Sequence, residues 1–507
     1  MICSHPVVVF RADATESIGG GHVMRCLTLA DAMADAGWIC SFATIPETLK
    51  IVPSLCNSDH GVNELQCLKD KEPEKLADWW SEGCDLLVVD HYERDVSFEL
   101  ECRPWARKIM VIDDYVQRQH SCDFLLDQTY ARNKTEYVGH VPQNCQSFLG
   151  SEYALLRPQF AELRPGTLKR RENQSDVSRL LITLGACEPK NITGQLLEAV
   201  EHSNINNKIE IDVILGSYSP FAQDLRERTS SWTRTVNIHE HVSDIATMMA
   251  KADVSIGAAG GTSMERCCLG LPSILLKLAE NQQSNITALS QYGAAIDLGS
   301  PEDICRERLG AALDDLCTNA VKRREMSRAC AGLCDGLGSQ RVLLSVMPPI
   351  QTRNNLPLTL RFATPEDSDI VFTWQTHSET RRFFRNPKAP KKAEHQQWYQ
   401  DNLRKSDRSL YIIQVNNEPV GTLRADKCIG NRTGLEISIA ISPERYGAGI
   451  GTAALAFARN VFCYENLWAE ILPMNKASQA IFKKAGFIPN EANWHVSKSC
   501  QKPLAKP

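Results

Sequence analysis

One stretch near the N-terminus, Phe10–Leu29 (FRADATESIGGGHVMRCLTL), limits the possible folds more than any other part of the sequence. The apolar residues Val7–Phe10 favour a β-strand, and from Val23 to Ala34 apolar residues recur at helical spacing. Three consecutive glycines lie between these segments: Gly19, Gly20 and Gly21. The sequence therefore predicts a strand, a glycine turn and a helix in that order, as in an α/β domain.

The glycine turn and the predicted helix start suit a phosphate ligand. Backbone amides approach a ligand closely where no side chain intervenes, and the first turn of a helix offers unpaired N–H groups with about half a positive charge. The next residue, His22, lies in that positive field, which disfavours the imidazolium form. We therefore expect a neutral histidine near pH 7, the form that a general base needs.

Two familiar phosphate-binding motifs do not fit this turn. No Gly-Lys-Ser/Thr follows the glycines, as it does in a Walker A loop. Met24 stands where a dinucleotide fingerprint has its third glycine, and no acidic residue ends the second strand near Phe42. A glycine turn with a purely structural role is the alternative interpretation.

Length and charge exclude several classes of protein. The 507 residues are enough for two to four domains. The net charge is -5 and charged residues are spread along the chain, which argues against nucleic acid or an anionic membrane as a partner. No apolar run reaches the roughly 18 residues of a membrane span, and the first ten residues lack the basic region of a signal peptide. We expect a cytoplasmic protein and leave its oligomeric state open.

The 19 cysteines do not predict a disulfide framework or a metal site. They are scattered through predicted helices and strands without a CxxC pair, which favours free thiols in a reducing compartment. The second half of the α/β region shows no carboxylate cluster with ligand spacing. No metal is therefore expected.

Residues 1–165 predict a first Rossmann-like domain. Two runs, Asp85–Asp90 (DLLVVD) and Lys108–Asp114 (KIMVIDD), are continuously apolar and end in acids, as buried strands of a parallel sheet do. The carboxyl ends of such strands line one ligand crevice, so polar residues there are expected near the glycine turn. They are Asp13, Asp90, His91, Tyr92, Asp113 and Asp114. Each aspartate could instead cap a helix.

Residues 175–346 predict a second Rossmann-like domain, with its own small-residue turn in Asp253–Pro272 (DVSIGAAGGTSMERCCLGLP). Gly260, Gly261 and Thr262 stand at a predicted helix start, where their amides could hold a diphosphate. Glu265 could accept both ribose hydroxyls, or could simply complement the helix dipole. Two such domains in succession resemble the GT-B arrangement of nucleotide-sugar glycosyltransferases.

The pattern changes after residue 346. Residues 347–358 (MPPIQTRNNLPL) break every period and predict a linker, and residues 359–500 predict an α+β domain. The strand at 434–441 leads through a glycine-rich loop into a helix. Amides and a hydroxyl in this loop suit a pyrophosphate: Gly447, Gly449, Gly451 and Thr452. Glu436 on the strand is a candidate base for a substrate ammonium, or else a surface glutamate.

Several ordered motifs, among them FRADATESIGGGHVMRCLTLA, LLVVDHYERDVSFE and GAAGGTSMERCCLGLPSILLKLAENQ, resemble the UDP-sugar hydrolases of pseudaminic acid biosynthesis. The resemblance covers roughly residues 5–345. Those enzymes remove UDP from UDP-2,4-diacetamido-2,4,6-trideoxy-β-L-altropyranose. The resemblance implies that His22 is the catalytic base, that Tyr92 positions the attacking water, and that Glu265 and Asn281 bind the UDP-sugar.

The C-terminal motifs YGAGIGTAALAFARNVF and NKASQAIFKKAGF resemble the GNAT acetyltransferases. The resemblance implies acetyl-CoA as co-substrate, with Tyr446 in the pyrophosphate loop and Asn475 and Ser478 near the cofactor arm. Many members have a tyrosine that protonates the leaving thiolate, and Phe482 stands at that position here. Water or Tyr446 would have to serve instead.

The two resemblances fit consecutive steps of one pathway and predict a bifunctional enzyme. The C-terminal domain would acetylate the 4-amino group of UDP-4-amino-4,6-dideoxy-N-acetyl-β-L-altrosamine. The N-terminal pair would then hydrolyse the product to UDP and 2,4-diacetamido-2,4,6-trideoxy-L-altrose. Two alternatives stay open: the N-terminal pair could be a glycosyltransferase, and the GNAT-like domain could act on a protein N-terminus or serve as a binding module.

Overall fold

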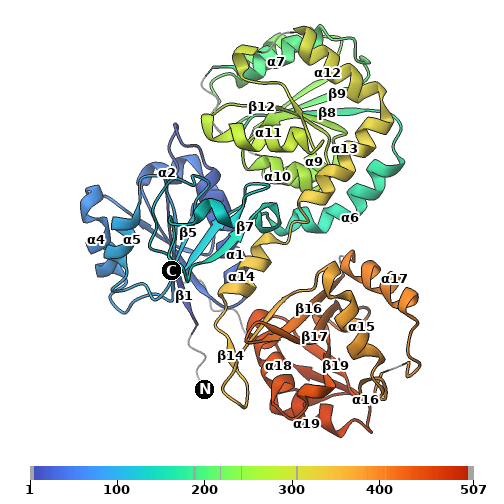
Figure 1. The fold of residues 1–507 in the computed structure, drawn as a ribbon. Helices are drawn as coiled ribbons and strands as arrows, with labels where there is room; N and C mark the ends of the chain where they lie inside the picture. Colours follow the sequence, from blue (N-terminus) through green and yellow to red (C-terminus); the bar gives the residue numbers. More distant parts are fainter. Residues whose placement is uncertain are drawn as a thin grey trace. The chain divides into compact units, whose positions relative to one another are not determined.

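The computed structural model describes residues 5–185, 190–216, 219–240, 242–303, 306–384, 386–405 and 407–500. Within them the strands form three sheets, two parallel and one mixed (Figure 1). Contacts divide the chain into two compact units. The first comprises Pro6–Ala30 and Cys40–Ser339, and the second comprises the chain from Gln340 onward with His5 and Asp31–Ile39.

The first parallel sheet has the order β3-β2-β1-β4-β5-β6-β7. Its strands are β1 (Val7–Ala12), β2 (Ile39–Thr44), β3 (Gly61–Glu64), β4 (Leu86–Asp90), β5 (Ile109–Ile112), β6 (Phe124–Asp127) and β7 (Gln146–Leu149). Its helices are α1 (Gly21–Asp35), α2 (Pro46–Ile51), α3 (Pro53–Cys56), α4 (Glu72–Trp79) and α5 (Val96–Cys102). The predicted strand, glycine turn and helix are confirmed. The two acid-ended runs form β4 and β5, both fully buried.

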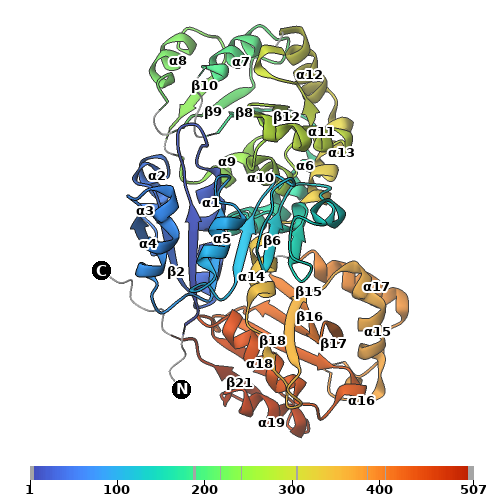
Figure 2. The same ribbon diagram turned by 60° about the vertical axis from the view of Figure 1, so that its left-hand side comes forward.

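The second parallel sheet has the order β10-β9-β8-β11-β12-β13. Its strands are β8 (Arg179–Thr183), β9 (Glu210–Ile214), β10 (Val236–His239), β11 (Val254–Ala258), β12 (Ser273–Leu276) and β13 (Ile296–Asp297). The helices are α6 (Pro158–Asn173), α7 (Ile192–Glu201), α8 (Ala222–Thr229), α9 (Ile245–Lys251), α10 (Thr262–Cys268), α11 (Gln283–Gln291), α12 (Arg306–Thr318) and α13 (Ala320–Leu333). The next helix, α14 (Gly338–Val346), begins at the end of this unit and belongs mostly to the second unit. Helices lie on both faces of this sheet (Figures 1 and 2).

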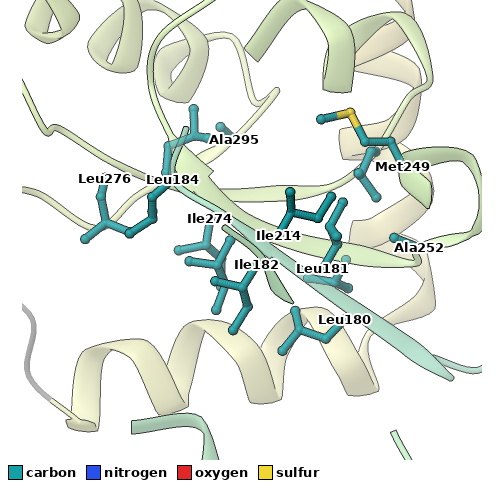
Figure 3. Close-up of a cluster of buried hydrophobic side chains, with 14 of the residues drawn as sticks. Leu180, Leu181, Ile182, Leu184, Ile214, Met249, Ala252, Ile274, Leu276 and Ala295 are labelled. Carbon is teal, nitrogen blue, oxygen red and sulfur yellow. The ribbon is translucent and has the colours of Figure 1, made fainter. Parts of the chain in front are cut away.

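The core of the second domain is built from apolar side chains on adjacent strands and on the helices that cover them. Figure 3 shows Leu181 and Ile182 of β8 beside Ile214 of β9 and Ile274 of β12, all buried. Met249 of α9 packs against the same cluster. Burial on both faces explains why the strands read as continuous apolar runs rather than alternating ones.

The third sheet has the order β14-β15-β16-β17-β18-β19-β21-β20. The strands are β14 (Ile350–Gln351), β15 (Pro357–Phe362), β16 (Arg408–Val415), β17 (Glu418–Lys427), β18 (Leu435–Ile441), β19 (Leu467–Glu470), β20 (Ile488–Pro489) and β21 (Trp494–Ser497). The helices are α15 (Ser368–Thr376), α16 (Ser378–Arg381), α17 (Lys392–Leu403), α18 (Ile450–Val461) and α19 (Lys476–Lys484). Neighbouring strands from β14 to β18 are antiparallel, and β18 and β19 are parallel.

Alternation along β16 assigns helices to the two faces of this sheet. Leu410 and Ile412 pack with Val371 of α15 and Tyr399 of α17, whereas Tyr411 points the other way and contacts Phe462 at the end of α18. The stretch predicted as a linker, 347–358, contains β14 and the start of β15. In the described part of the chain, no helix has both the length and the apolar character that crossing a membrane requires.

Candidate active sites

His22 is the second residue of α1, directly after the glycine turn. The turn closes with a hydrogen bond from the Gly19 amide to the Thr15 carbonyl, 2.7 Å, and Gly19 has a positive φ of 77°. A side chain at Gly20 would approach Val52 to 3.0 Å, so the chain leaves little room there. The turn therefore delivers the His22 ring to the carboxyl ends of β1 and β4.

Asp90, the last residue of β4, holds His22 and Arg25 together. His22 Nδ1 lies 2.5 Å from Asp90 Oδ1, and Arg25 binds both carboxylate oxygens, at 2.5 and 2.6 Å. Although burial alone would raise it, the pKa of Asp90 is held well below its usual range by Arg25 and His22. A carboxylate only accepts hydrogen bonds, so Nδ1 carries the hydrogen and Nε2 carries the lone pair of the neutral ring.

Tyr92 joins this cluster to the second domain. Its ring meets His22 edge-on with centroids 4.8 Å apart, and its hydroxyl donates to Asp114 Oδ1 at 2.9 Å. Asn281, in a short 3-10 turn (Glu280–Gln282), donates to the same hydroxyl at 3.1 Å. Burial and the neighbouring Asp114 raise the pKa of Tyr92, so it keeps its proton. Three of the predicted site residues therefore converge: His22, Tyr92 and Asn281.

The second-domain turn has a different geometry. Gly261 caps α10, which begins at Thr262, and the side-chain amide of Asn285 fixes the turn by donating to the Ala259 carbonyl at 2.7 Å. Glu265 lies in the first turn, and its Oε1 is 3.4 Å from Arg157 at the start of α6. Burial raises the pKa of Glu265. Glu265 therefore lies one helical turn after Gly261, at the position in the helix that the sequence predicted.

The predicted cofactor loop joins β18 to α18. Gly447 and Gly449 both have positive φ, and Gly449 caps α18, which starts at Ile450 with Gly451 and Thr452 in its first turn. A Cβ on Gly449 would lie 2.8 Å from that of Arg353. Strands β18 and β19 pair only at Leu435–Leu467 and Glu436–Trp468, so the remainder of β18 on that side has no strand ladder with β19.

Other residues predicted for the acetyltransferase site are more dispersed. Tyr446 is 53% exposed, and its hydroxyl lies 3.2 Å from Thr380 Oγ1. Asn475 caps α19 by accepting from the Ser478 amide at 3.0 Å, so these two residues engage each other. Phe482 is buried and packs edge-on against Phe487 with centroids 4.9 Å apart. Glu436 lies opposite Asp426 across the β17–β18 ladder.

The polar residues at the ends of β1, β4 and β5, which the sequence placed together near the glycine turn, form separate clusters. Asp90, Tyr92 and Asp114 join His22. Asp13 instead binds His91 and Arg11, and Asp113 binds His120. Successive residues at a strand end point to opposite sides, which separates Asp90 from His91. The reasoning from sequence missed Arg25 and Arg157. Arg25 could have been found, since it lies three residues after His22 and thus on the same helix face.

Two family models match separate parts of the chain. Residues 179–337 match the glycosyltransferase family 28 C-terminal domain, and residues 357–488 match the acetyltransferase (GNAT) domain. The crystal structure of Acinetobacter baumannii MurG superposes with a TM-score of 0.51 at 14% identity, covering 67% of this chain and 99% of MurG. This likeness confirms the GT-B-type fold of the α/β pair, which a GNAT α+β domain follows.

Two relatives are similar to this chain, one over its first part and the other over almost its whole length. The UDP-2,4-diacetamido-2,4,6-trideoxy-β-L-altropyranose hydrolase of Campylobacter jejuni is 26% identical over 291 residues, covering 57% of this chain and 98% of that enzyme. An uncharacterized protein of Methanocaldococcus jannaschii is 22% identical over 504 residues, covering 94% of this chain and 95% of that protein. The Campylobacter relative confirms the resemblance stated for the N-terminal part, and the GNAT family match confirms the one stated for the C-terminal part.

Proposed function

We propose that this chain is a bifunctional enzyme that acetylates a UDP-linked amino sugar with acetyl-CoA and then hydrolyses the product to UDP and free sugar. The proposed acceptor is UDP-4-amino-4,6-dideoxy-N-acetyl-β-L-altrosamine, and the proposed products are UDP and 2,4-diacetamido-2,4,6-trideoxy-L-altrose. The observation that carries the hydrolase half is the Arg25–Asp90–His22 arrangement beside Tyr92 and Asn281.

In the hydrolase site, His22 acts as the general base through Nε2. A water molecule attacks the anomeric carbon, its proton passes to Nε2, and the bond from that carbon to the phosphate oxygen breaks. Asp90 accepts from Nδ1, fixes the tautomer and stabilises the imidazolium that forms. Tyr92, kept protonated, helps to position the water. UDP leaves with the bonding electrons.

The second-domain turn receives the departing UDP. Gly261 and Thr262 stand at the start of α10, where backbone N–H groups have no hydrogen-bond partner within the helix. Their amides are therefore the donors that bind the diphosphate. Glu265 accepts from the ribose hydroxyls. Asn281 contacts the UDP-sugar from the side of Tyr92. Gly19, Gly20 and Gly21 approach the sugar phosphate from the first domain.

In the acetyltransferase site, Glu436 takes a proton from the substrate ammonium. The free amine attacks the thioester carbonyl of acetyl-CoA, its nitrogen releases a second proton to solvent, and the C–S bond breaks to give the amide and the thiolate of CoA. Because Phe482 has no proton to donate, water or Tyr446 protonates the thiolate. The loop amides of Gly447, Gly449 and Gly451, with Thr452, hold the pyrophosphate. The part of β18 that lacks a ladder with β19 offers backbone groups to the amide-bearing cofactor arm.

A basic segment supports a UDP-linked acceptor rather than a free sugar. Residues 377–392 (HSETRRFFRNPKAPKK) carry six basic residues and one acidic residue. The hydrogen bond between Thr380 and Tyr446 ties this segment to the cofactor loop. A diphosphate is attracted to such a segment, whereas a free amino sugar, which carries an ammonium group, is repelled by it. This favours acetylation before UDP removal.

A coupled assay tests the proposal. The purified protein is incubated with the UDP-4-amino sugar, with and without acetyl-CoA, while UDP and free thiol are followed. We expect thiol release first and UDP release that requires acetyl-CoA, with UDP release lost in His22→Gln while thiol release persists. UDP release at the same rate without acetyl-CoA, or no thiol release in any condition, would overturn the order or the acetyltransferase assignment.

The likeness to MurG favours a second candidate function for the N-terminal pair, transfer of the sugar to an acceptor. The same assay separates the two functions because it contains no acceptor other than water. Reducing sugar that appears in equimolar amount with UDP supports hydrolysis. UDP release only after a sugar or lipid acceptor is added supports a transferase.

A further inference from the structure

Arg266 is a buried cation whose hydrogen-bonding groups are not all used. It follows Glu265 in α10, and its side chain is 1% exposed. One guanidinium nitrogen, Nη2, donates to the Ala258 carbonyl. The other two nitrogens, Nε and Nη1, have no hydrogen-bond partner in the described part of the chain. Burial lowers the pKa of Arg266 to about 10, so the guanidinium stays charged at neutral pH.

The guanidinium lies against the carboxyl end of β11. A Cβ on Gly257 would lie 2.3 Å from Arg266 Nη1 and 3.0 Å from the Thr183 carbonyl. Only glycine therefore leaves space for the guanidinium, and Gly257 pairs with Thr183 in the neighbouring strand β8. Ligands of open parallel sheets bind at this edge. Arg266 is thus directed at the base of the turn that joins β11 to α10.

A second buried arginine of the same domain shows what a purely structural role looks like. Arg171 is 6% exposed, and its three guanidinium nitrogens donate to the carbonyls of Leu269, Ala252 and Met249 at 2.8, 2.8 and 2.9 Å. A buried cation with unused donors costs stability, because it has lost its water without full replacement. Arg171 avoids that cost and Arg266 does not.

We propose that Arg266 supplies the buried positive charge that stabilises the nucleotide diphosphate at the β11–α10 turn, and that it positions this turn through Ala258. The inference rests on the proposed binding of UDP by the second domain. The charge acts through a poorly solvated interior, where electrostatic attraction is stronger than in water. Arg266 is a positioning residue in this scheme, since its unused nitrogens are covered and do not touch the ligand.

Within the described part of the chain, the charge of Arg266 is only partly balanced by the groups around it. Glu265, whose charge acts on it, is also engaged by Arg157 at 3.4 Å. Cys267 and Cys330, which also face it, are buried thiols. A bound diphosphate therefore offers the missing anion. The unfavourable free energy of this buried charge in the ligand-free protein is offset when the diphosphate binds. Arg266 is therefore a determinant of affinity for phosphate-bearing ligands.

Thermal unfolding and calorimetric titration of the full chain with UDP and with uridine test this proposal. For Arg266→Met we expect an unchanged or higher melting temperature without ligand and a Kd for UDP raised about tenfold, with the Kd for uridine unchanged. Arg266→Lys, which keeps the charge, should retain most of the affinity for UDP. Uridine separates a charge effect from a general distortion of the site, because it lacks the diphosphate.

Arg323→Met is the matched structural control. Arg323 is 7% exposed and donates to the carbonyls of Leu316 and Cys317 at 2.6 and 3.0 Å, so its loss should lower the melting temperature while the Kd for UDP stays the same. A destabilised Arg266→Met, wild-type affinity of that variant for UDP, or equal weakening of UDP and uridine would each overturn the role of Arg266. Failure of the wild-type chain to bind UDP would instead overturn the proposed function.

Discussion

His22 Nδ1 lies 2.5 Å from Asp90 Oδ1, although the two residues are 68 positions apart. The contact joins the first turn of α1 to the last residue of β4, so it depends on the parallel pairing of β1 with β4. Arg25, three residues after His22, completes the arrangement by binding the same carboxylate. The hydrogen bond to Asp90 fixes the tautomer of His22 and leaves Nε2 on the side of the ring away from Asp90.

Asp90→Asn should lower UDP release by about 10²–10⁴-fold, because an amide can hold the wrong tautomer of His22 in place. UDP release is measured from the already acetylated substrate. Thiol release from acetyl-CoA by the same preparation is the internal control and should be unchanged. Unchanged UDP release would show that Asp90 does not act on the base.

Arg25→Met should destabilise the protein by about 3–5 kcal/mol, because it leaves the buried Asp90 carboxylate without its cation. Chemical denaturation measures the loss. The double variant Arg25→Met/Asp90→Leu removes both charges and should recover most of the stability. If the double variant is as unstable as the single one, packing rather than charge explains the loss.

Much of the fold could be predicted from the sequence because local patterns decide it. The turn at Gly19–Gly21 breaks the chain between an apolar run and a helical period, and β4 and β5 are short apolar runs that end in acids. The alternating pattern at residues 434–441, before the glycine-rich loop of the C-terminal domain, likewise predicts the start of β18 to within one residue. Each of these elements is fixed by neighbours in the chain.

The site could be predicted only in part because it depends on distant pairing. Asp90, His91 and Asp113 all end or follow apolar strands, yet only Asp90 reaches His22. His91 turns to Asp13, which the buried Arg11 also binds. Which strand-end residue faces which neighbour depends on sheet register and on the alternation of side chains. Neither can be read from one segment alone.

Glu436→Gln should lower acetyl transfer by about 10²-fold or more, since an amide cannot take the proton from the substrate ammonium. Thiol release is followed at saturating acetyl-CoA. UDP release from the pre-acetylated substrate should be unchanged. Glu444→Gln, at an exposed position in the loop between β18 and α18, is the matched control and should retain acetyl transfer. Equal loss in both variants would contradict a specific role for Glu436.

His120 should make the stability of the protein depend on pH above neutrality. It is buried between Glu99 and Asp113, at 2.6 and 2.9 Å. Burial opposes its charge, but the hydrogen bonds to Asp113 and Glu99 raise the pKa of His120 to about 9. Because the folded pKa lies above the unfolded value, about 6.5, the stabilisation is fully present below pH 6.5 and is lost as the pH rises through 9.

This pKa difference corresponds to about 3 kcal/mol of unfolding free energy between pH 6 and pH 10. Urea denaturation at both values measures it in the wild-type chain and in His120→Gln. The variant should be less stable at pH 6 and should lose most of this decline toward pH 10. His202→Gln, at an exposed histidine, should keep the wild-type decline. An equal decline in the His120 variant would place its origin in other groups, because the glutamine has no proton to lose in this range.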